Sequence, residues 1–353
     1  MSLLGYVLRR ILFSFFVVLG ELVIVFYLTN IAAPNPAAIW AGPEATPQQI
    51  ALVTSLYHLK SPWYIQLAYY LKNVLTGNWG VSPLYQRPVI SLIEQYLPVS
   101  LELAIFAFVL KVLLEVLLGV VSAIRPGGLA DGAIKVFYTV TRSMPPFLLA
   151  LGLLLVFAYE LKVFPSSQPI NPLIALKTPP FKVYNPFTHT YAEIWLIDNM
   201  PVLNALLVGD WTAFHSAVLH AILPTVTLVF FGFGGLVRLV KVSMIDALQS
   251  DYIRTARSKG LVERVVVFRH ALRNSLLPAT TLMGLIFAQL VSGSLVVETV
   301  FDYYGLGYYI GQSLLTFDTP SLIGGTIVIT ILIVASNLVT DLLYGMLDPR
   351  IRV

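Results

Sequence analysis

The most charged segment of this otherwise apolar chain is Asp251–Pro278. Three of its positive charges, Arg254, Arg257 and Lys259, lie within six consecutive residues. Such groups could pair with carboxylates on a partner protein, or they could face water and lipid headgroups, because exposed ion pairs contribute little. The segment is therefore a candidate binding element.

Two short helices joined by a glycine are predicted around these charges. Apolar residues recur there at three- and four-residue spacing, which is typical of an amphipathic helix. The predicted apolar stripe consists of Ile245, Leu248, Tyr252 and Ala256. The pair Lys259-Gly260 is typical of a helix end, because glycine readily adopts a positive φ, and Glu263 is expected to begin the next helix.

Four further ionisable side chains fall within apolar runs, where a charge is a candidate for function. They are Glu21, Lys111, Glu115 and Arg142. Lys111 and Glu115 lie four residues apart on one helix face, so we expect them to neutralise each other, away from lipid. Glu21 has no partner in its own helix; it could pair with Lys111 across helices or face a transport pathway.

An alternative interpretation uses Glu21, Lys111 and Glu115 as an ion relay in a secondary transporter driven by an ion gradient. Such transporters contain inverted repeats with broken helices in matching halves. The sequence shows neither feature, so this interpretation is the weaker one.

No arrangement of catalytic residues accompanies these charges. The sequence contains no G-x-x-x-x-G-K-[ST] loop for nucleotide phosphates, no H-E-x-x-H and no G-x-S-x-G. Its five histidines are dispersed and it has no cysteine, which excludes disulfides and Cys-ligated zinc. We therefore expect no enzyme activity, no catalytic residue, no metal and no cofactor.

The elements that position these residues are expected to be membrane-spanning helices. Of the 353 residues, 57% are hydrophobic and 11% are charged, whereas an average soluble domain has about 25% charged residues. Six apolar runs are long enough to cross a hydrocarbon core of ~30 Å. The expected spans are residues 11–33, 101–124, 134–159, 218–242, 275–297 and 322–347. The first run exceeds the apolar region of a signal peptide and contains Glu21, which favours a span.

Basic residues in the short loops predict the orientation of these spans. Those on one side are Arg9, Arg10, Arg125, Lys135, Arg238, Lys241, Arg254, Arg257, Lys259, Arg264, Arg269, Arg273, Arg350 and Arg352. By the positive-inside rule, this side is cytoplasmic and holds both termini and the charged hairpin. Two long segments, 34–99 and 160–217, are then extracytoplasmic. Because the charges are scattered over short loops, the net charge of +4 does not indicate nucleic-acid binding.

Aromatic residues gather in the first of these long segments. They are Trp40, Trp63, Tyr69, Tyr70 and Trp79. They could anchor an interfacial hairpin at headgroup level.

Two consecutive prolines interrupt the third expected span at Met144-Pro-Pro-Phe147. They remove backbone donors and force a kink, which neighbouring helices or Arg142 and Ser143 must compensate.

Several motifs together resemble the first (B-type) permease of the dipeptide, oligopeptide and nickel family of ABC importers. They are R-T-A-R-S-K-G-L at 254–261, R-H-A-L-R-N-S-L-L-P at 269–278, E-T-V-F-D-Y-Y-G-L-G at 298–307, G-N-W-G-V-S at 77–82, R-P-V at 87–89 and L-D-P-R-I-R at 347–352. Of the general loop pattern E-A-A-x-x-x-G-x9-I-x-L-P, only Ala256, Gly260 and Leu272 match, but B-type permeases typically have R-T-A-R-A-K-G-L there. Asn78 and Tyr304 depart from the family, which often has Asp and Pro at these positions.

The resemblance implies an all-α, six-span, type I importer permease in a heteromeric complex in the cell membrane. Residues 1–33 would hold the N-terminal tail and first span, 34–99 an extracytoplasmic segment, and 100–353 the permease domain. The cytoplasmic loop 243–275 would contain a coupling helix that docks on an ATPase through Arg254, Thr255, Ala256, Arg257, Lys259, Gly260 and Leu261. Expected partners are a second homologous permease, two ATP-binding subunits, an extracytoplasmic substrate-binding protein and lipid. Peptides are the expected cargo, and oligosaccharides or nickel chelates are carried by relatives.

The family has a similar S-x-P-x-F element at the two prolines. The resemblance therefore makes Ser143, Pro145 and Pro146 candidates to line the transport pathway, together with Glu21. For residues 34–99, it implies contact with the substrate-binding protein or with the mouth of the pore, as the alternative to an interfacial hairpin.

Overall fold

The computed structural model describes residues 3–185 and 190–347, and these residues form mainly helices. By length and composition, five helices among them can cross a membrane, and a sixth span exists if one bent pair is counted as one. The long helices are α1 (Leu3–Phe26), α5 (Val89–Ile124), α11 (Trp211–Phe230), α15 (Leu272–Val300) and α17 (Thr319–Leu347). The predicted all-α polytopic membrane fold is confirmed.

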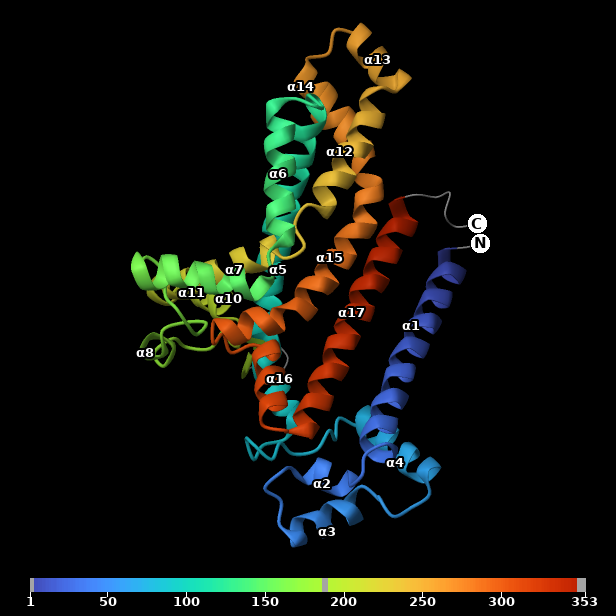
Figure 1. The fold of residues 1–353 in the computed structure, drawn as a ribbon, viewed down its shortest axis with the longest axis vertical. Helices are drawn as coiled ribbons and strands as arrows, with labels where there is room; N and C mark the ends of the chain where they lie inside the picture. Colours follow the sequence, from blue (N-terminus) through green and yellow to red (C-terminus); the bar gives the residue numbers. More distant parts are fainter. Residues whose placement is uncertain (1–2, 186–189, 348–353) are drawn as a thin grey trace.

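The molecule is elongated, and its two ends differ in structure (Figure 1). One end carries the short helix α13 (Asp251–Ser258), which follows α12 (Gly235–Leu248). The opposite end carries three short helices, α2 (Pro36–Ala41), α3 (Pro47–Leu56) and α4 (Trp63–Leu75). Between the ends, α1 packs against α17, α17 against α15, and α5 against α12.

Small residues allow the long helices to approach closely. On α15, the carbonyl of Gly284 accepts a hydrogen bond of 3.0 Å from the Ser336 hydroxyl of α17. On α5, a Cβ atom added to Gly119 would lie 2.8 Å from Val240 Cβ of α12. Because lipid tails are as apolar as the helices, close packing of this kind supplies much of the attraction between membrane helices.

The third predicted span is broken rather than gently kinked. Helix α6 (Leu129–Ser143) is followed by α7 (Pro146–Leu153) and the π-helix η2 (Leu154–Glu160), and the two halves meet at 101°. Pro146 occupies the first turn of α7, where the N–H that proline lacks would have no partner within the helix. The prolines therefore separate two helices instead of bending one.

The fourth predicted span, 218–242, is wrong as a single helix. Helix α11 ends at Phe230, residues 231–234 form a turn, and α12 begins at Gly235. The sequence there is Phe-Gly-Phe-Gly-Gly, and Gly232 and Gly234 have φ of 63° and 99°. Two residues in this left-handed region cannot continue a right-handed helix, which an apolar sequence count does not reveal.

Replacing Gly234 with alanine is expected to destabilise the protein by at least about 1 kcal/mol, because alanine is strained at positive φ. The added Cβ would also lie 2.7 Å from the ring of Tyr138. Gly235→Ala is the matched control, since no atom lies within 4 Å of its added Cβ and its φ is not positive. Thermal unfolding in detergent should show a lower midpoint for Gly234→Ala alone, and equal midpoints would contradict the strained turn.

The outer segment 34–99 forms a packed module, so the alternative in which all five of its aromatics anchor at headgroup level is wrong in part. Trp40 and Tyr70 are buried in a cluster with Leu22, Phe26 and Ile323. The indole N–H of Trp40 donates to the side-chain oxygen of Asn30, in the π-helix η1 (Tyr27–Ile31), at 3.2 Å. Trp63 and Tyr69 are exposed, as surface anchors must be, and Trp79 is partly buried.

The second long segment, 160–217, holds short elements rather than a span. They are α8 (Pro172–Ala175), the antiparallel strands β1 (Lys182–Asn185) and β2 (Thr190–Glu193), α9 (Trp195–Asp198) and α10 (Pro201–Val208). The small hairpin β1–β2 adds strand structure to the predicted all-α fold. At the other end of the sequence, the motif at 347–352 lies outside the described residues beyond Leu347.

Candidate functional site: a docking helix at the end of the bundle

Helix α13 lies at the extreme end of the molecule (Figure 1). One face of the helix is packed on the core and the other is exposed. Ile253 and Ala256 are buried in the main core, together with Val266 and Val267 of the following π-helix η3 (Val266–Ala271). The predicted apolar stripe is therefore wrong in part: Ile253 points inward, and Tyr252 is 42% exposed. The reason is that α12 ends at Leu248, so α13 begins with its own rotation about its axis.

Gly260 ends α13, as the sequence predicts. Its φ is 75°, and its N–H donates to the carbonyl of Arg257 at 2.9 Å. The N–H of Leu261 donates to the carbonyl of Ala256 at 3.4 Å, so the last carbonyls of the helix are satisfied. The next helix, α14 (Glu263–Val265), begins at the predicted glutamate.

The outward face of α13 and its end is basic. Thr255, Lys259 and Leu261 are exposed there, and the Arg254 side chain is 74% exposed. Arg257 already binds a carboxylate of this chain, because its Nη2 and Nε donate to Glu263 at 2.6 and 3.2 Å. Arg254 is held less tightly, because its Nη1 lies 3.5 Å from Oδ1 of the exposed Asp251. Arg254 and Lys259 therefore present charge to the surroundings more freely than Arg257 does.

A polar cavity of 580 Å³ lies beside α13 and was not predicted from the sequence. It is lined by Tyr252 and, from η3 and α15, by Arg269, His270, Arg273 and Asn274. Among residues 3–185 and 190–347, the two arginines make no ion pair with an acidic side chain. The cavity extends the basic character of this end of the molecule.

The end of the molecule that carries α13 is tied to the neighbouring hairpin α5–α6. Lys241 of α12 lies 2.5 Å from Asp131 of α6. The same carboxylate accepts hydrogen bonds from the N–H of Gly127, at 2.8 Å, and from the hydroxyl of Ser122. These contacts hold α12, and with it α13, against the end of α5.

The candidate pathway residues are not brought together. Ser143 and Pro145 are exposed at the corner between α6 and α7, and the Ser143 hydroxyl donates to the carbonyl of Thr139 at 2.9 Å. Glu21 is half-buried on α1, where its side chain interacts with Thr330 of α17. Its Oε2 atom has no hydrogen-bond partner among the described residues.

Lys111 and Glu115 form the predicted ion pair, with Nζ and Oε1 3.2 Å apart and both side chains buried. The suggestion that Glu21 pairs with Lys111 is wrong, because the ammonium is occupied by Glu115 and by carbonyls of Val229 and Phe231. All three partners of Lys111 belong to α5 or to the end of α11, whereas Glu21 belongs to α1.

Two of the buried carboxylates that the sequence reasoning missed cap short helices. Glu298, at the end of α15, accepts from the Ser100 hydroxyl at 2.6 Å and from the N–H of Tyr308 at 3.0 Å. The same Ser100 oxygen accepts from the N–H of Leu306 at 2.7 Å, so both groups cap α16 (Leu306–Leu315). The available signal was an acid at the end of an apolar run, followed within ten residues by Gly-Leu-Gly.

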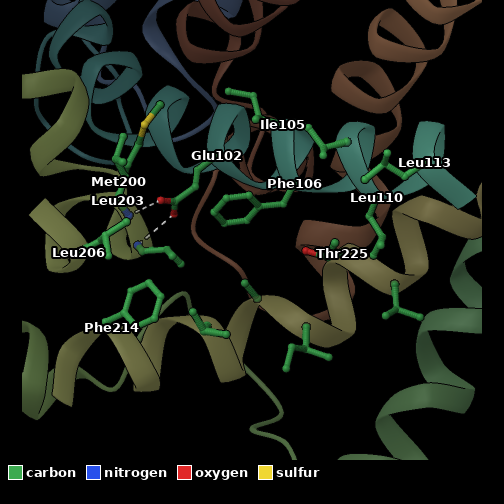
Figure 2. A pocket seen from close by; sticks show the side chains of 16 residues that line it. Glu102, Ile105, Phe106, Leu110, Leu113, Met200, Leu203, Leu206, Phe214 and Thr225 are labelled. Atoms are coloured by element: carbon green, nitrogen blue, oxygen red, sulfur yellow. Dashed lines mark hydrogen bonds between the residues drawn. The ribbon is translucent and has the colours of Figure 1, made fainter. Parts of the chain in front are cut away.

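The second missed carboxylate, Glu102, caps another short helix. It accepts from the N–H groups of Leu203 at 2.7 Å and Val202 at 3.3 Å, in the first turn of α10 (Figure 2). It lies at one end of an apolar cavity of 780 Å³ between α5, α10 and α11. Figure 2 shows Phe106 and Phe214 at this cavity.

These features define a multi-pass membrane protein with a basic helix exposed at one end of its bundle. Residues 115–353 match the family described as binding-protein-dependent transport system inner membrane component. This match covers more than half of the sequence, and the chain therefore belongs to that family.

Whole-length relatives agree with this assignment. The chain is similar to a dipeptide transport system permease protein of Alkalihalophilus pseudofirmus, with 32% identity over 99% of this chain and 100% of the relative. It is 32% identical to a probable D,D-dipeptide transport system permease protein of Escherichia coli, over 95% and 94% of the two chains. It is also 30% identical to an oligopeptide transport system permease protein of Bacillus subtilis, over 99% of both. The chain is a permease subunit of a binding-protein-dependent importer, which is not an enzyme class.

Proposed function

We propose that this permease couples ATP hydrolysis on partner subunits to solute import, and that α13 is the surface on which an ATPase docks. The observation that supports this most is the amphipathic construction of α13. Its inner face is anchored in the permease core through Ile253 and Ala256, while Arg254, Thr255 and Lys259 face outward. A partner that pushes on the outer face therefore displaces the core residues that hold the helix.

The same assignment orients the molecule. The end that carries α13 and both termini is cytoplasmic, and the module α2–α4 with the segment 160–217 is extracytoplasmic. The antiparallel packing of α1 and α17 supports this, because α1 starts and α17 finishes toward the α13 end (Figure 1). The outer elements would receive a substrate-binding protein, and a second homologous permease would complete the pathway.

The proposed cargo is a peptide. Relatives aligned over nearly the whole chain are named as dipeptide, D,D-dipeptide and oligopeptide permeases. The permease would form half of the pathway, with two separate ATP-binding subunits performing the hydrolysis. It would have no catalytic role itself.

Reversing the charge of Arg254 is expected to release the ATP-binding subunits. The tagged permease would be purified gently from its native membrane as wild type, as Arg254→Glu and as Lys135→Glu. Like-charge contacts cost several kcal/mol at an interface, so Arg254→Glu should reduce the recovered ATP-binding subunits by about tenfold or more.

Lys135 is the matched control, because it is an exposed basic residue on α6. Lys135→Glu should retain the ATP-binding subunits at the wild-type level. Equal recovery with wild type and Arg254→Glu would show that α13 is not the docking surface. A wild-type permease that purifies without ATP-binding subunits and supports ion-driven uptake would contradict the proposed function itself.

A further inference from the structure

The break between α11 and α12 lies on the route from the docking helix to the membrane helices. Helix α12 leads directly to α13, whereas α11 packs against α5, α7 and α10. Between them, residues 231–234 include two glycines with positive φ. Glycine has little conformational preference of its own, so such a turn would flex unless other contacts held it.

The ion pair Lys111–Glu115 of α5 contacts both sides of this break. The ammonium of Lys111 donates to the carbonyls of Val229 and Phe231, at the end of α11, at 2.9 and 2.6 Å. The carboxylate of Glu115 accepts from the N–H groups of Leu236 and Val237, at the start of α12, at 2.8 and 3.3 Å.

This arrangement matches the electrostatics of helix ends. The last carbonyls and first N–H groups of a helix have no partner within it, and they carry partial negative and positive charge respectively. Lys111 places its positive charge at the C-terminal end of α11, and Glu115 places its negative charge at the N-terminal end of α12. One pair, four residues apart, therefore replaces hydrogen bonds that the break removes from both helices.

Burial strengthens these hydrogen bonds, but burial alone does not explain why two charged residues occupy these positions. The Lys111 and Glu115 side chains are 2% and 0% exposed, and the Lys111 ammonium lies 5.6 Å from the centre of the Phe233 ring. A buried ion pair often adds no net stability over apolar residues of the same volume. Apolar residues at these positions could not bond to either helix end, and that is the distinctive property of the pair.

Helix α11 is also loosely packed on α5 along part of its length. The cavity of 780 Å³ between them is lined by Leu110 and Leu113 of α5 and by Thr225 and Val226 of α11 (Figure 2). Because the cavity separates the two helices there, the hydrogen bonds of Lys111 at the end of α11 contribute more to fixing the angle between α11 and α5.

We propose that Lys111 and Glu115 are positioning residues that stiffen the break, so that displacement of α13 reaches α11 instead of being absorbed by the turn. This inference rests on the proposed docking of an ATPase at α13. It assigns a mechanical role to two intramembrane charges that otherwise resemble an ion relay.

The test uses the complete importer in lipid nanodiscs and distances between spin labels. The permease has no cysteine, so pairs of cysteines can be introduced as label sites. Spin-label signal from cysteines of the partner subunits is measured on a complex with the unsubstituted permease and subtracted. Exposed positions Thr212 on α11 and Asp246 on α12 span the break without touching the docking face of α13, and Ser55 on α3 provides a distant reference. Each label pair is measured with and without ATP in wild type and in Lys111→Met/Glu115→Gln.

Wild type should give a narrow 212–246 distribution with and without ATP, and a 212–55 distance that shifts when ATP binds. The neutral double variant should give a broadened 212–246 distribution and lose the 212–55 shift, while ATP-binding subunits remain attached. Lys182→Met/Glu193→Gln is the matched control, because it removes an exposed 3.0 Å ion pair that contacts no helix break.

The charge-reversed variant Lys111→Glu/Glu115→Lys separates helix-end bonding from simple neutralisation. It keeps two opposite charges but places the carboxylate against carbonyls and the ammonium against N–H groups. The proposal predicts that its distance distribution across the break is as broad as that of the neutral variant and that the 212–55 shift is lost. A narrow distribution with the wild-type 212–55 shift would overturn the proposal. If this variant does not fold, the neutral variant decides: a narrow 212–246 distribution with an intact 212–55 shift would also overturn the proposal. Failure of ATPase docking is detected separately, as loss of ATP-binding subunits from wild type, and the width of the 212–246 distribution still tests the stiffness of the break.

Discussion

Lys111→Met should destabilise the permease by about 3–5 kcal/mol, because it leaves the Glu115 carboxylate buried without a counter-charge. Glu115 is 0% exposed, and the Lys111 ammonium, 3.2 Å from its Oε1, is the only cation in ion-pair contact with it among the described residues. The carbonyls of Val229 and Phe231 would lose their donor as well. Denaturant titration of the purified permease in mixed micelles measures the difference in the free energy of unfolding.

The double variant Lys111→Met/Glu115→Gln should recover much of this loss. Glutamine keeps an oxygen that can accept from the N–H groups of Leu236 and Val237, and no charge remains buried. A single variant as stable as wild type, or a double variant less stable than the single one, would contradict this description of the pair.

Glu298→Ala should also cost several kcal/mol, since unsatisfied buried donors cost about 1–3 kcal/mol each and a cavity is left. The Ser100 hydroxyl and the N–H of Tyr308 would both lose their acceptor. These bonds attach α16 to α5 and α15, so the loss should be local as well as global. Hydrogen exchange should show that the variant accelerates exchange of amides 306–315, relative to wild type, more than it accelerates exchange of amides in α12.

Glu298→Gln is the conservative control. It keeps the shape of the side chain and the acceptor for Ser100, so its unfolding midpoint should stay much closer to wild type than that of the alanine variant. Equal midpoints for alanine and wild type would show that the carboxylate does not hold α16 in place.

The sequence predicted the membrane-spanning elements well because their signal is local. Apolar runs revealed the long helices, and the prolines at 145 and 146 revealed the interruption of the third span. Lys259-Gly260 and Glu263 revealed the end of α13 and the start of α14. Each of these depends on neighbours within a few residues.

What the sequence could not show depends on contacts between distant segments. The turn at 231–234 has an apolar sequence, and only the positive φ of Gly232 and Gly234 separates it from a continuous span. The hydrogen bonds of Glu102 to Val202 and of Ser100 to Glu298 join residues 100 and 198 positions apart along the chain. The pairing of Lys111 with Glu115 was predictable from their spacing, but their bonds to α11 and α12 were not.

Photocrosslinking from α13 tests the central claim most directly. Single cysteines replace Thr255 on α13 or Ser55 on α3, both exposed, and carry a thiol-reactive photocrosslinker in native membranes. The tagged permease is then purified under denaturing conditions and its adducts are identified by mass spectrometry. Position 255 should crosslink to an ATP-binding subunit and position 55 should not. An ATP-binding subunit attached at position 55, or absent from position 255 in a complex that still contains it, would contradict the assignment of α13 as the docking helix.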